Sequence, residues 1–390
     1  MKLITFHKTV IGILLFATIF QINGVCQNYP PINYLSNNQI NSLDERNITT
    51  NPNVGRIKGV FDVSPIGACS YTIPLFVSPG TAGIQPEISI VYNSQIGNGI
   101  MGIGWNPSCY STISRAQQNY YNDGNIQPIK GNDEDRFTLD GNRLIEVTGG
   151  SGNIKYYRTE LETFSKITRI DDPTSGQEFK IETKDGKTLL YGTTDDSKVH
   201  GYFYPQVSPK IDKGIYLWRL KKVIDANGNY FEYFYNTTSF DLHAVESVLE
   251  KIEYTKNDNS STTLPVNIIK FNYGTRSDAY STFFAGCKMS RSLLLSSIEI
   301  ICGGNSARLY QFEYAIATNS HLVQIKECVA NESLNSTIIK WGVEQSDFEI
   351  TDAVQLSKDD VYIGDFNGDG LSDVATITGY VANYTIFKVF

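Results

Sequence analysis

Apolar and polar residues alternate in short runs between about residue 70 and residue 343. The clearest run covers residues 230–235. A period of two places successive side chains on opposite faces of a β-strand. Other runs with strand-like composition cover 71–77, 87–92, 155–158, 179–183, 188–191, 216–223, 268–273, 309–314 and 338–343. The pattern predicts an all-β, antiparallel fold.

Dipeptides that favour tight turns separate many of these runs. They are Pro79-Gly80, Asp123-Gly124, Asp140-Gly141, Asp185-Gly186 and Asn227-Gly228. Asx-Gly pairs adopt the left-handed conformations that join antiparallel strands. Helical patterns are confined to residues 115–121 and 239–248, so we expect little helix.

Composition supports this interpretation and excludes some classes of protein. Hydrophobic residues make up 41% of the chain, with 24 Tyr and 20 Phe, which excludes a disordered protein. The formal net charge of −8 is opposite in sign to a nucleic-acid-binding surface, so we expect no nucleic-acid partner. A length of 390 residues allows two or three domains.

Residues 1–26 have the pattern of a secretory signal peptide. Lys2 and Lys8 precede an apolar run at residues 10–20, which is too short to span a bilayer. Gly24 and Cys26 suit the cleavage positions. The alternative is a lipoprotein acylated at Cys26, although Val25 replaces the small residue expected there. No other apolar stretch is long enough to span a membrane, so we expect a secreted, extracellular or cell-surface protein without a transmembrane span.

The remaining chain divides into three parts. Residues 27–54 are rich in Asn, Pro and Ser and predict an extended linker. Residues 55–345 form the β-rich domain, and residues 350–390 form a separate, incomplete repeat. The five cysteines after residue 26 show no zinc-binding spacing. Their predicted state is buried and reduced, with at most one bridge, for instance between Cys287 and Cys302.

An acidic loop near the C-terminus carries the strongest signal for chemistry. Its pattern, DxNxDGxxD, spaces oxygen ligands and a glycine as a Ca²⁺ loop requires. A glutamate at loop position 12 and flanking helices, which an EF-hand needs, are missing, so the flanks 361–364 and 374–377 are predicted strands. The alternative is an acidic turn without metal. The predicted structural Ca²⁺ ligands are Asp365, Asn367, Asp369, the backbone oxygen of Leu371, and Asp373.

No catalytic motif is recognisable, and we expect no enzymatic activity in this chain. The histidines His200, His243 and His321 are isolated in sequence. The acid pairs at 133/135 and 171/172 lie in polar turns and are interpreted as solvated. The GxGxxG pattern at residues 97–102 lacks the helix that a dinucleotide site needs. Its glycines are expected to bend the backbone and to let Trp105 pack over them. No catalytic or cofactor-binding residues are assigned.

Several sequence blocks together resemble a known family. They run from Gly59 to Leu75, Pro79 to Pro86, Tyr92 to Gly99, Gly102 to Trp105, Ile113 to Arg115, Asp135 to Leu144, and Trp218 to Tyr230. These blocks resemble the Salmonella virulence plasmid B protein (SpvB) family, whose module also begins the TcB component of insecticidal toxin complexes and many Rhs/YD-repeat proteins. The acidic loop resembles an FG-GAP/VCBS repeat of a β-propeller.

The resemblance implies a toxin or virulence role without catalysis. It implies a β-rich shell that encloses a C-terminal effector, with an Rhs/TcC-like partner or a downstream Rhs region. Further implied partners are a translocation component or a host cell surface. The ADP-ribosyltransferase domain of the virulence protein has no counterpart here, and a secretion signal departs from toxin-complex components. The first alternative is a calcium-dependent cell-surface adhesin or glycan-binding module. The second is a hydrolase with an unrecognised site.

Overall fold

The computed structural model describes residues 29–43, 57–174, 176–203, 211–241, 244–260, 265–330, 332–342, 361–364, 373–381 and 384–389. The predicted signal peptide at 1–26 lies outside the described residues. The chain divides into two compact units between Trp341 and Gly342. The boundary expected from the sequence lies a few residues later, between 345 and 350. Each unit is described by itself.

Eight strands of the first unit close into an antiparallel barrel, in which each strand pairs with the next and β15 returns to pair with β7. Closure leaves no free edge in this part of the sheet. The strands are β7 (Thr112–Ala116), β8 (Arg136–Leu139), β9 (Asn142–Val147), β10 (Ile154–Thr159), β11 (Lys166–Asp172), β12 (Gly176–Glu182), β13 (Thr188–Tyr191) and β15 (Ile211–Ile224).

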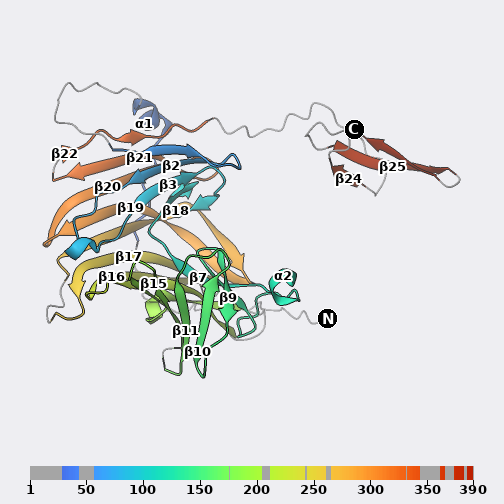
Figure 1. Cartoon of the computed structure of the whole chain (residues 1–390). Helices are drawn as coiled ribbons and strands as arrows, with labels where there is room; N and C mark the ends of the chain where they lie inside the picture. Colours follow the sequence, from blue (N-terminus) through green and yellow to red (C-terminus); the bar gives the residue numbers. More distant parts are fainter. Residues whose placement is uncertain are drawn as a thin grey trace, which may run out of the picture. The chain divides into compact units, whose positions relative to one another are not determined.

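Strand β15 continues from the barrel into a sheet of long antiparallel strands (Figure 1). Strand β14 (Lys198–Phe203) pairs with β15 on the way. The long strands are β16 (Asn229–Asp241), β17 (Ala244–Asn257), β18 (Asn267–Phe284), β19 (Cys287–Cys302), β20 (Asn305–Ile316) and β21 (Ser320–Val329). Two short strands, β22 (Glu332–Ser333) and β23 (Thr337–Ile338), pair with β21. Of the predicted strand at 338–343, the described part, residues 338–342, has only Ile338 in a strand.

Three tyrosines repeat one contact along this sheet. The hydroxyls of Tyr235, Tyr273 and Tyr314 each donate a 2.6 Å hydrogen bond to a leucine carbonyl on the preceding strand. The acceptors are Leu220, Leu249 and Leu295. A fourth leucine carbonyl, that of Leu322, accepts a 2.8 Å bond from Trp341 Nε1 instead. Each acceptor begins the same pattern, a leucine followed three residues later by a buried valine or isoleucine.

Each of the three tyrosines also marks an irregularity of strand register. The register shifts between residues 234 and 235 of β16, 272 and 273 of β18, and 313 and 314 of β20. A β-bulge bends its strand and increases the local twist. Repeated at the same position of successive hairpins, the bulge curves the sheet in one direction, and the buried tyrosine hydroxyl satisfies a carbonyl at the bend.

A smaller four-stranded sheet packs on the long strands. It consists of β1 (Val60–Val63), β2 (Cys69–Pro74), β3 (Ser89–Asn93) and β6 (Trp105–Pro107). Figure 1 shows β2 and β3 beside β18 and β20. The Phe76 amide donates to the hydroxyl of Tyr310 at 2.9 Å, which joins the two sheets. The resulting core is continuous with the barrel interior.

The rejected dinucleotide motif forms a tight glycine turn, as the sequence analysis expected. It contains β4 (Asn98–Gly99) and β5 (Gly102–Ile103). Gly102 and Gly104 have φ values of +81° and +73°. A side chain at Gly104 would collide with the ring of Tyr92. Trp105 packs against this ring, with centroids 5.3 Å apart, so the turn serves packing.

The predicted linker is docked where the structure describes it. Ile32 N donates to Thr275 O at 2.9 Å, and Leu35 N donates to Tyr314 O at 2.8 Å. Tyr29 packs edge-on against Tyr273. Helix α1 (Asn37–Ser42) follows. Residues 29–35 are therefore extended but packed on the core, because three of their apolar side chains find partners that sequence spacing does not reveal.

Two local expectations are wrong. In the helical candidate 239–248, residues 239–241 end β16 and residues 244–248 begin β17, since strand pairing overrides the local pattern. Cys287 and Cys302 are the two ends of the 16-residue strand β19. At about 3.3 Å per residue these ends lie on the order of 50 Å apart, so they cannot form a bridge with each other. All five described cysteines are free.

The second unit contains a three-stranded antiparallel sheet of β24 (Val361–Gly364), β25 (Asp373–Val381) and β26 (Tyr384–Val389). Strands β24 and β25 flank the acidic loop, so the predicted strand-loop-strand arrangement is confirmed for both flanks. A propeller is not seen in the described residues. A search of those same residues for a helix long and apolar enough to cross a bilayer finds none.

Candidate functional site

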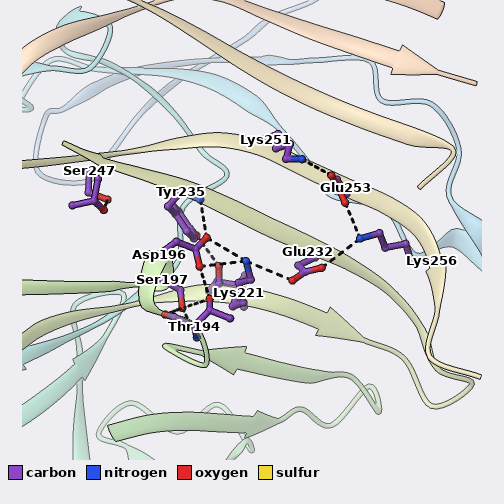
Figure 2. Close-up of polar contacts among 12 residues, drawn as sticks. Thr194, Asp196, Ser197, Lys221, Glu232, Tyr235, Ser247, Lys251, Glu253 and Lys256 are labelled. Atoms are coloured by element: carbon purple, nitrogen blue, oxygen red, sulfur yellow. Dashed lines mark hydrogen bonds and ion pairs between the residues drawn. The ribbon is translucent and has the colours of Figure 1, made fainter. Parts of the chain in front are cut away.

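A chain of alternating charges runs across β15, β16 and β17. Figure 2 shows that Lys221 links Asp196 to Glu232, and that Lys256 links Glu232 to Glu253. We call this group the lysine network. Its members are Asp196, Lys221, Glu232, Lys251, Glu253 and Lys256. Three ammonium groups face three carboxylates, so the network carries no net charge.

The network surrounds an aromatic ring. The Nζ atoms of Lys221 and Lys251 lie 4.0 and 4.6 Å from the centre of the Phe234 ring. A cation over an aromatic face is stabilised by the ring quadrupole. Lys256 Nζ lies 2.7 Å from Glu253 Oε2. Burial lowers the pKa of Lys256, but the hydrogen bond and charge of Glu253 outweigh it and hold this pKa above its usual value.

The pKa shifts of Lys256 and Glu253 both favour the charged ion pair. A lysine acts as a nucleophile or base when its pKa is lowered, and that of Lys256 is raised. Burial raises the pKa of its partner Glu253, but hydrogen bonds from Lys251 and Lys256 outweigh burial and hold this pKa below its usual value. The geometry favours cross-strand stabilisation of the three strands.

A second charged cluster closes one end of the barrel. Arg115 Nη1 lies 3.1 Å from Asp135 Oδ2, with both side chains buried. The Asp135 carboxylate also accepts from the amides of Lys130 and Gly131 at 2.8 and 2.7 Å. Burial lowers the pKa of Arg115, and the charge and hydrogen bond of Asp135 raise it; the first effect is larger.

A second arginine completes this cluster. Arg169, which is 1% exposed, contacts Asp171 at 2.8 Å and Asp133 at 2.6 Å. Hydrogen bonds from Arg169 and Gln177, with the charge of Arg169, lower the pKa of Asp133 against the opposing effect of burial. Asp133, Asp135 and Asp171 were interpreted as solvated turn residues. This is wrong for Asp135, which is buried against Arg115, whereas Asp133 is 70% exposed as expected and also binds Arg169. Asp171 is partly exposed and pairs with Arg169 on the same strand.

Aromatic side chains fill the barrel below the arginines. The ring of Phe137 contacts those of Phe179, Trp218 and Tyr157 edge-on, with centroids 5.3, 5.5 and 6.0 Å apart. Burial raises the pKa of Tyr157 to about 12. Arg115 and Arg169 lie over the Phe137 ring at 5.7 and 5.4 Å. These rings pack the barrel interior around Phe137.

The predicted calcium site falls mostly outside the described residues. Asp365, Asn367, Asp369 and Leu371 lie in the part of the chain that the structure does not describe, and Asp373 is the first residue of β25. Gly364 pairs with Asp373 across the two strands. This register brings the two ends of the loop together, as a ligand set drawn from both ends requires. Elsewhere in the described residues, no group of three or more His, Cys, Asp or Glu could hold a metal ion.

Sequence reasoning did not find the lysine network or the barrel arginines. Lysines and acids alternate with apolar residues along 221–256, which signals only an outward polar face. Which lysine meets which acid depends on strand register and on the bulge between 234 and 235. The arginines carry no signal of burial in their sequence neighbourhood.

Comparison with known proteins identifies the module. Residues 63–298, more than half of the chain, match the family described as Salmonella virulence plasmid 65kDa B protein. A search of curated proteins found no match.

Solved structures share the fold. The TcdB2-TccC3 structure matches with a TM-score of 0.63 at 17% identity, over 87% of this chain and 20% of that chain. The Photorhabdus luminescens Tc holotoxin pore gives 0.63 at 16% identity, over 87% and 20%. The N-terminal domain of the effector protein SpvB from Salmonella typhimurium strain LT2 gives 0.53 at 16% identity, over 66% of this chain and 99% of that one. The chain thus spans about a fifth of the toxin-complex chains.

Proposed function

The chain belongs to the Salmonella virulence plasmid 65kDa B protein family, and we propose that it is a component of an exported toxin complex. In this proposal it forms part of a non-catalytic shell that encloses and delivers a C-terminal effector. The observation that carries the proposal is the series of bulges at Tyr235, Tyr273 and Tyr314, which curve a sheet of long strands. A wall of this kind needs no convergent catalytic site.

The partners follow from the same proposal. The structural neighbours include chains of TcdB2-TccC3, which supports an Rhs/TcC-like partner or a downstream Rhs region that completes the shell. Docking to a translocation component and export by the N-terminal signal are further parts of the proposal. The arginine-bound state of Asp133, Asp135 and Asp171 supports a structural role for these acids rather than hydrolysis.

Protease protection tests the shell. The full gene product, expressed together with its Rhs-type partner, is expected to protect the effector segment from a broad-specificity protease by at least about tenfold in cleavage rate, because local exposure controls cleavage. Gel analysis over time measures the rate. The control is the same effector segment expressed alone. Equal cleavage rates in the two samples would overturn the shell proposal.

We also propose the first repeat of an FG-GAP type at residues 350–390, with Ca²⁺ held by Asp365, Asn367, Asp369, Leu371 and Asp373. The ion would neutralise carboxylates that otherwise repel one another. Because bound Ca²⁺ stabilises only the folded state, EGTA is expected to lower the melting temperature of a chain with a completed propeller by about 5 °C.

Two variants make this prediction specific. Asp369→Ala should melt at the same temperature with and without EGTA, as read by differential scanning fluorimetry. Asn383→Ala, a polar change outside the loop, should keep the full response. A melting curve of the unsubstituted protein that does not move on chelation would count against the site.

A further inference from the structure

An extended segment near the N-terminus, residues 29–35, lies on the sheet of long strands, and we call it the strap. Both backbone groups of Thr275 on β18 bond to the strap, the N–H as donor and the carbonyl as acceptor, each at 2.9 Å. At the other end of the strap, Leu35 N donates to Tyr314 O on β20 at 2.8 Å. The contacts have parallel register but are isolated bridges, so the strap is laid on the sheet without forming a regular strand of it.

The backbone groups that the strap satisfies lie where the sheet is irregular. The register between β18 and β19 shifts between residues 272 and 273 and again between Thr275 and Tyr280. The register between β20 and β21 shifts next to Tyr314. A register irregularity leaves backbone groups without a partner in the ladder, and a backbone group left unpaired on folding destabilises the protein. Main-chain bonds of this kind are how a sheet binds an added extended peptide.

Gly274 makes room for the strap. A β-carbon at this position would lie 2.7 Å from Ile32 Cδ1 and 2.8 Å from Pro30 O, and the third nearest atom also belongs to Ile32. The φ of Gly274 is outside the left-handed region, so its backbone conformation suits any residue. The missing side chain therefore serves the close approach of the strap, and a side chain here would collide with the strap first.

A tyrosine near each end of the strap adds side-chain contacts. Tyr29 packs edge-on against Tyr273, with ring centroids 6.4 Å apart, and its hydroxyl accepts a 3.0 Å hydrogen bond from Asn236. The hydroxyl of Tyr34 bonds to Ser320 Oγ at 2.9 Å, and Ser320 is fully buried. The two prolines after Tyr29 restrict the unbound segment to extended conformations, which lowers the entropy lost on binding.

The strap has the exposure of a bound peptide. Its two prolines and Asn33 are exposed, and its apolar side chains are half-buried. Hollows of about 380 and 260 Å³ remain beside it, the first reaching Glu250 and Lys270 and the second reaching Gln311 and Glu313. A core segment is close-packed on every side, whereas the strap fills only part of a wider groove.

We propose that this groove is a binding site for an extended peptide of the pattern aromatic–Pro–Pro–aliphatic, and that the strap is its ligand, supplied by the chain itself. Main-chain bonds set the direction of the peptide, and Gly274 admits the aliphatic side chain. Tethering raises the effective concentration of such a ligand to the order of millimolar, so the groove is filled in the intact chain. The proposal is independent of the shell function. The strap groove is formed by Asn236, Tyr273, Gly274, Thr275, Tyr314 and Ser320.

Release of the strap in the full chain is the first test. Gly274→Ala should displace the strap, so that chymotrypsin cleaves after Tyr34 or Leu35 at least about tenfold faster than in the unsubstituted protein, because cleavage requires local opening. Mass spectrometry of the fragments locates the cut. The matched control is Gly97→Ala, whose β-carbon meets no atom within 4 Å and which should be cleaved at the unsubstituted rate.

Binding in trans is the second test. A chain that lacks residues 1–35 should bind a fluorescent peptide of residues 29–35 at least about tenfold more tightly than the full chain, whose own strap competes for the groove. Fluorescence anisotropy measures the affinity. Gly274→Ala in the strap-free chain should weaken binding by about tenfold or more. A peptide with Tyr34→Phe loses the hydroxyl bond to Ser320 and should bind about fivefold more weakly.

Three results would overturn the proposal. The first is equal cleavage of the Gly274→Ala and unsubstituted proteins. The second is a strap-free chain that circular dichroism shows to be folded but that does not bind the peptide, or one that is unfolded and that excess peptide does not restore. The third is equal binding of a scrambled peptide of the same composition, which would identify the groove as a nonspecific apolar surface.

Discussion

Replacement of Asp135 with alanine is expected to destabilise the barrel by about 3–5 kcal/mol, since it leaves the buried guanidinium of Arg115 without its counter-charge. The side chains of Arg115 and Asp135 are 4% and 1% exposed. The substitution also removes the acceptor of the backbone amides of Lys130 and Gly131, which donate to the same carboxylate. An uncompensated charge in a packed interior is one of the largest penalties that a single change can impose.

The adjacent carboxylate gives a matched control. Glu134 is exposed and pairs with Lys130 on the surface, so Glu134→Ala should leave the stability unchanged within error. Urea unfolding followed by tryptophan fluorescence measures both variants, because Trp218 lies in the barrel against Phe137. Equal midpoints for the two variants would show that the Arg115–Asp135 pair does not hold the barrel.

Gly102→Ala is the substitution with the second largest expected effect, a loss of about 2–4 kcal/mol. Gly102 has φ of +81°, a conformation that alanine adopts only with strain. A β-carbon there would lie 2.3 Å from the carbonyl oxygen of Ser320. Since this oxygen belongs to the backbone, relief of the collision requires the turn at 97–104 to move away from β21, which adds an overpacking penalty.

Gly97→Ala, in the same motif, tests the explanation. A β-carbon at Gly97 meets no atom within 4 Å, so we expect a change below about 0.5 kcal/mol. Thermal unfolding of the two variants gives the comparison. If both glycines tolerate alanine equally, the steric account of the motif is wrong. If both variants unfold normally but lose affinity for a nucleotide, the rejected dinucleotide interpretation would have to be reconsidered.

Local pattern predicted much of the secondary structure. Asp140-Gly141 joins β8 to β9, Asp185-Gly186 joins β12 to β13, and Asn227-Gly228 joins β15 to β16, since left-handed turn residues act within a few positions of themselves. The strand at 188–191 has the predicted bounds. The helix predicted at 239–248 is wrong, because pairing between β16 and β17 overrides the helical spacing of apolar residues there.

The candidate sites depended on contacts between distant segments. The calcium loop is a local motif, and its ligand spacing could be read from the nine consecutive positions 365–373; its ion remains a prediction. The lysine network and the barrel arginines each combine residues from separate strands or loops. Asp135 has the sequence context of a solvated acid, yet it is buried against Arg115 on β7.

The sequence by itself determined the all-β class, the positions of most turns, the family resemblance and the strand-loop-strand unit after residue 360. These properties follow from short-range periodicity and from motifs of a few residues. Only the tertiary structure decided that β15 returns to β7 to close the barrel, that Tyr235, Tyr273 and Tyr314 stand at bulges, and that Asp135 is buried. A period of two fixes which face a side chain occupies, but any strand edge can in principle pair with any other, so partners and burial are settled by the packing of the whole domain.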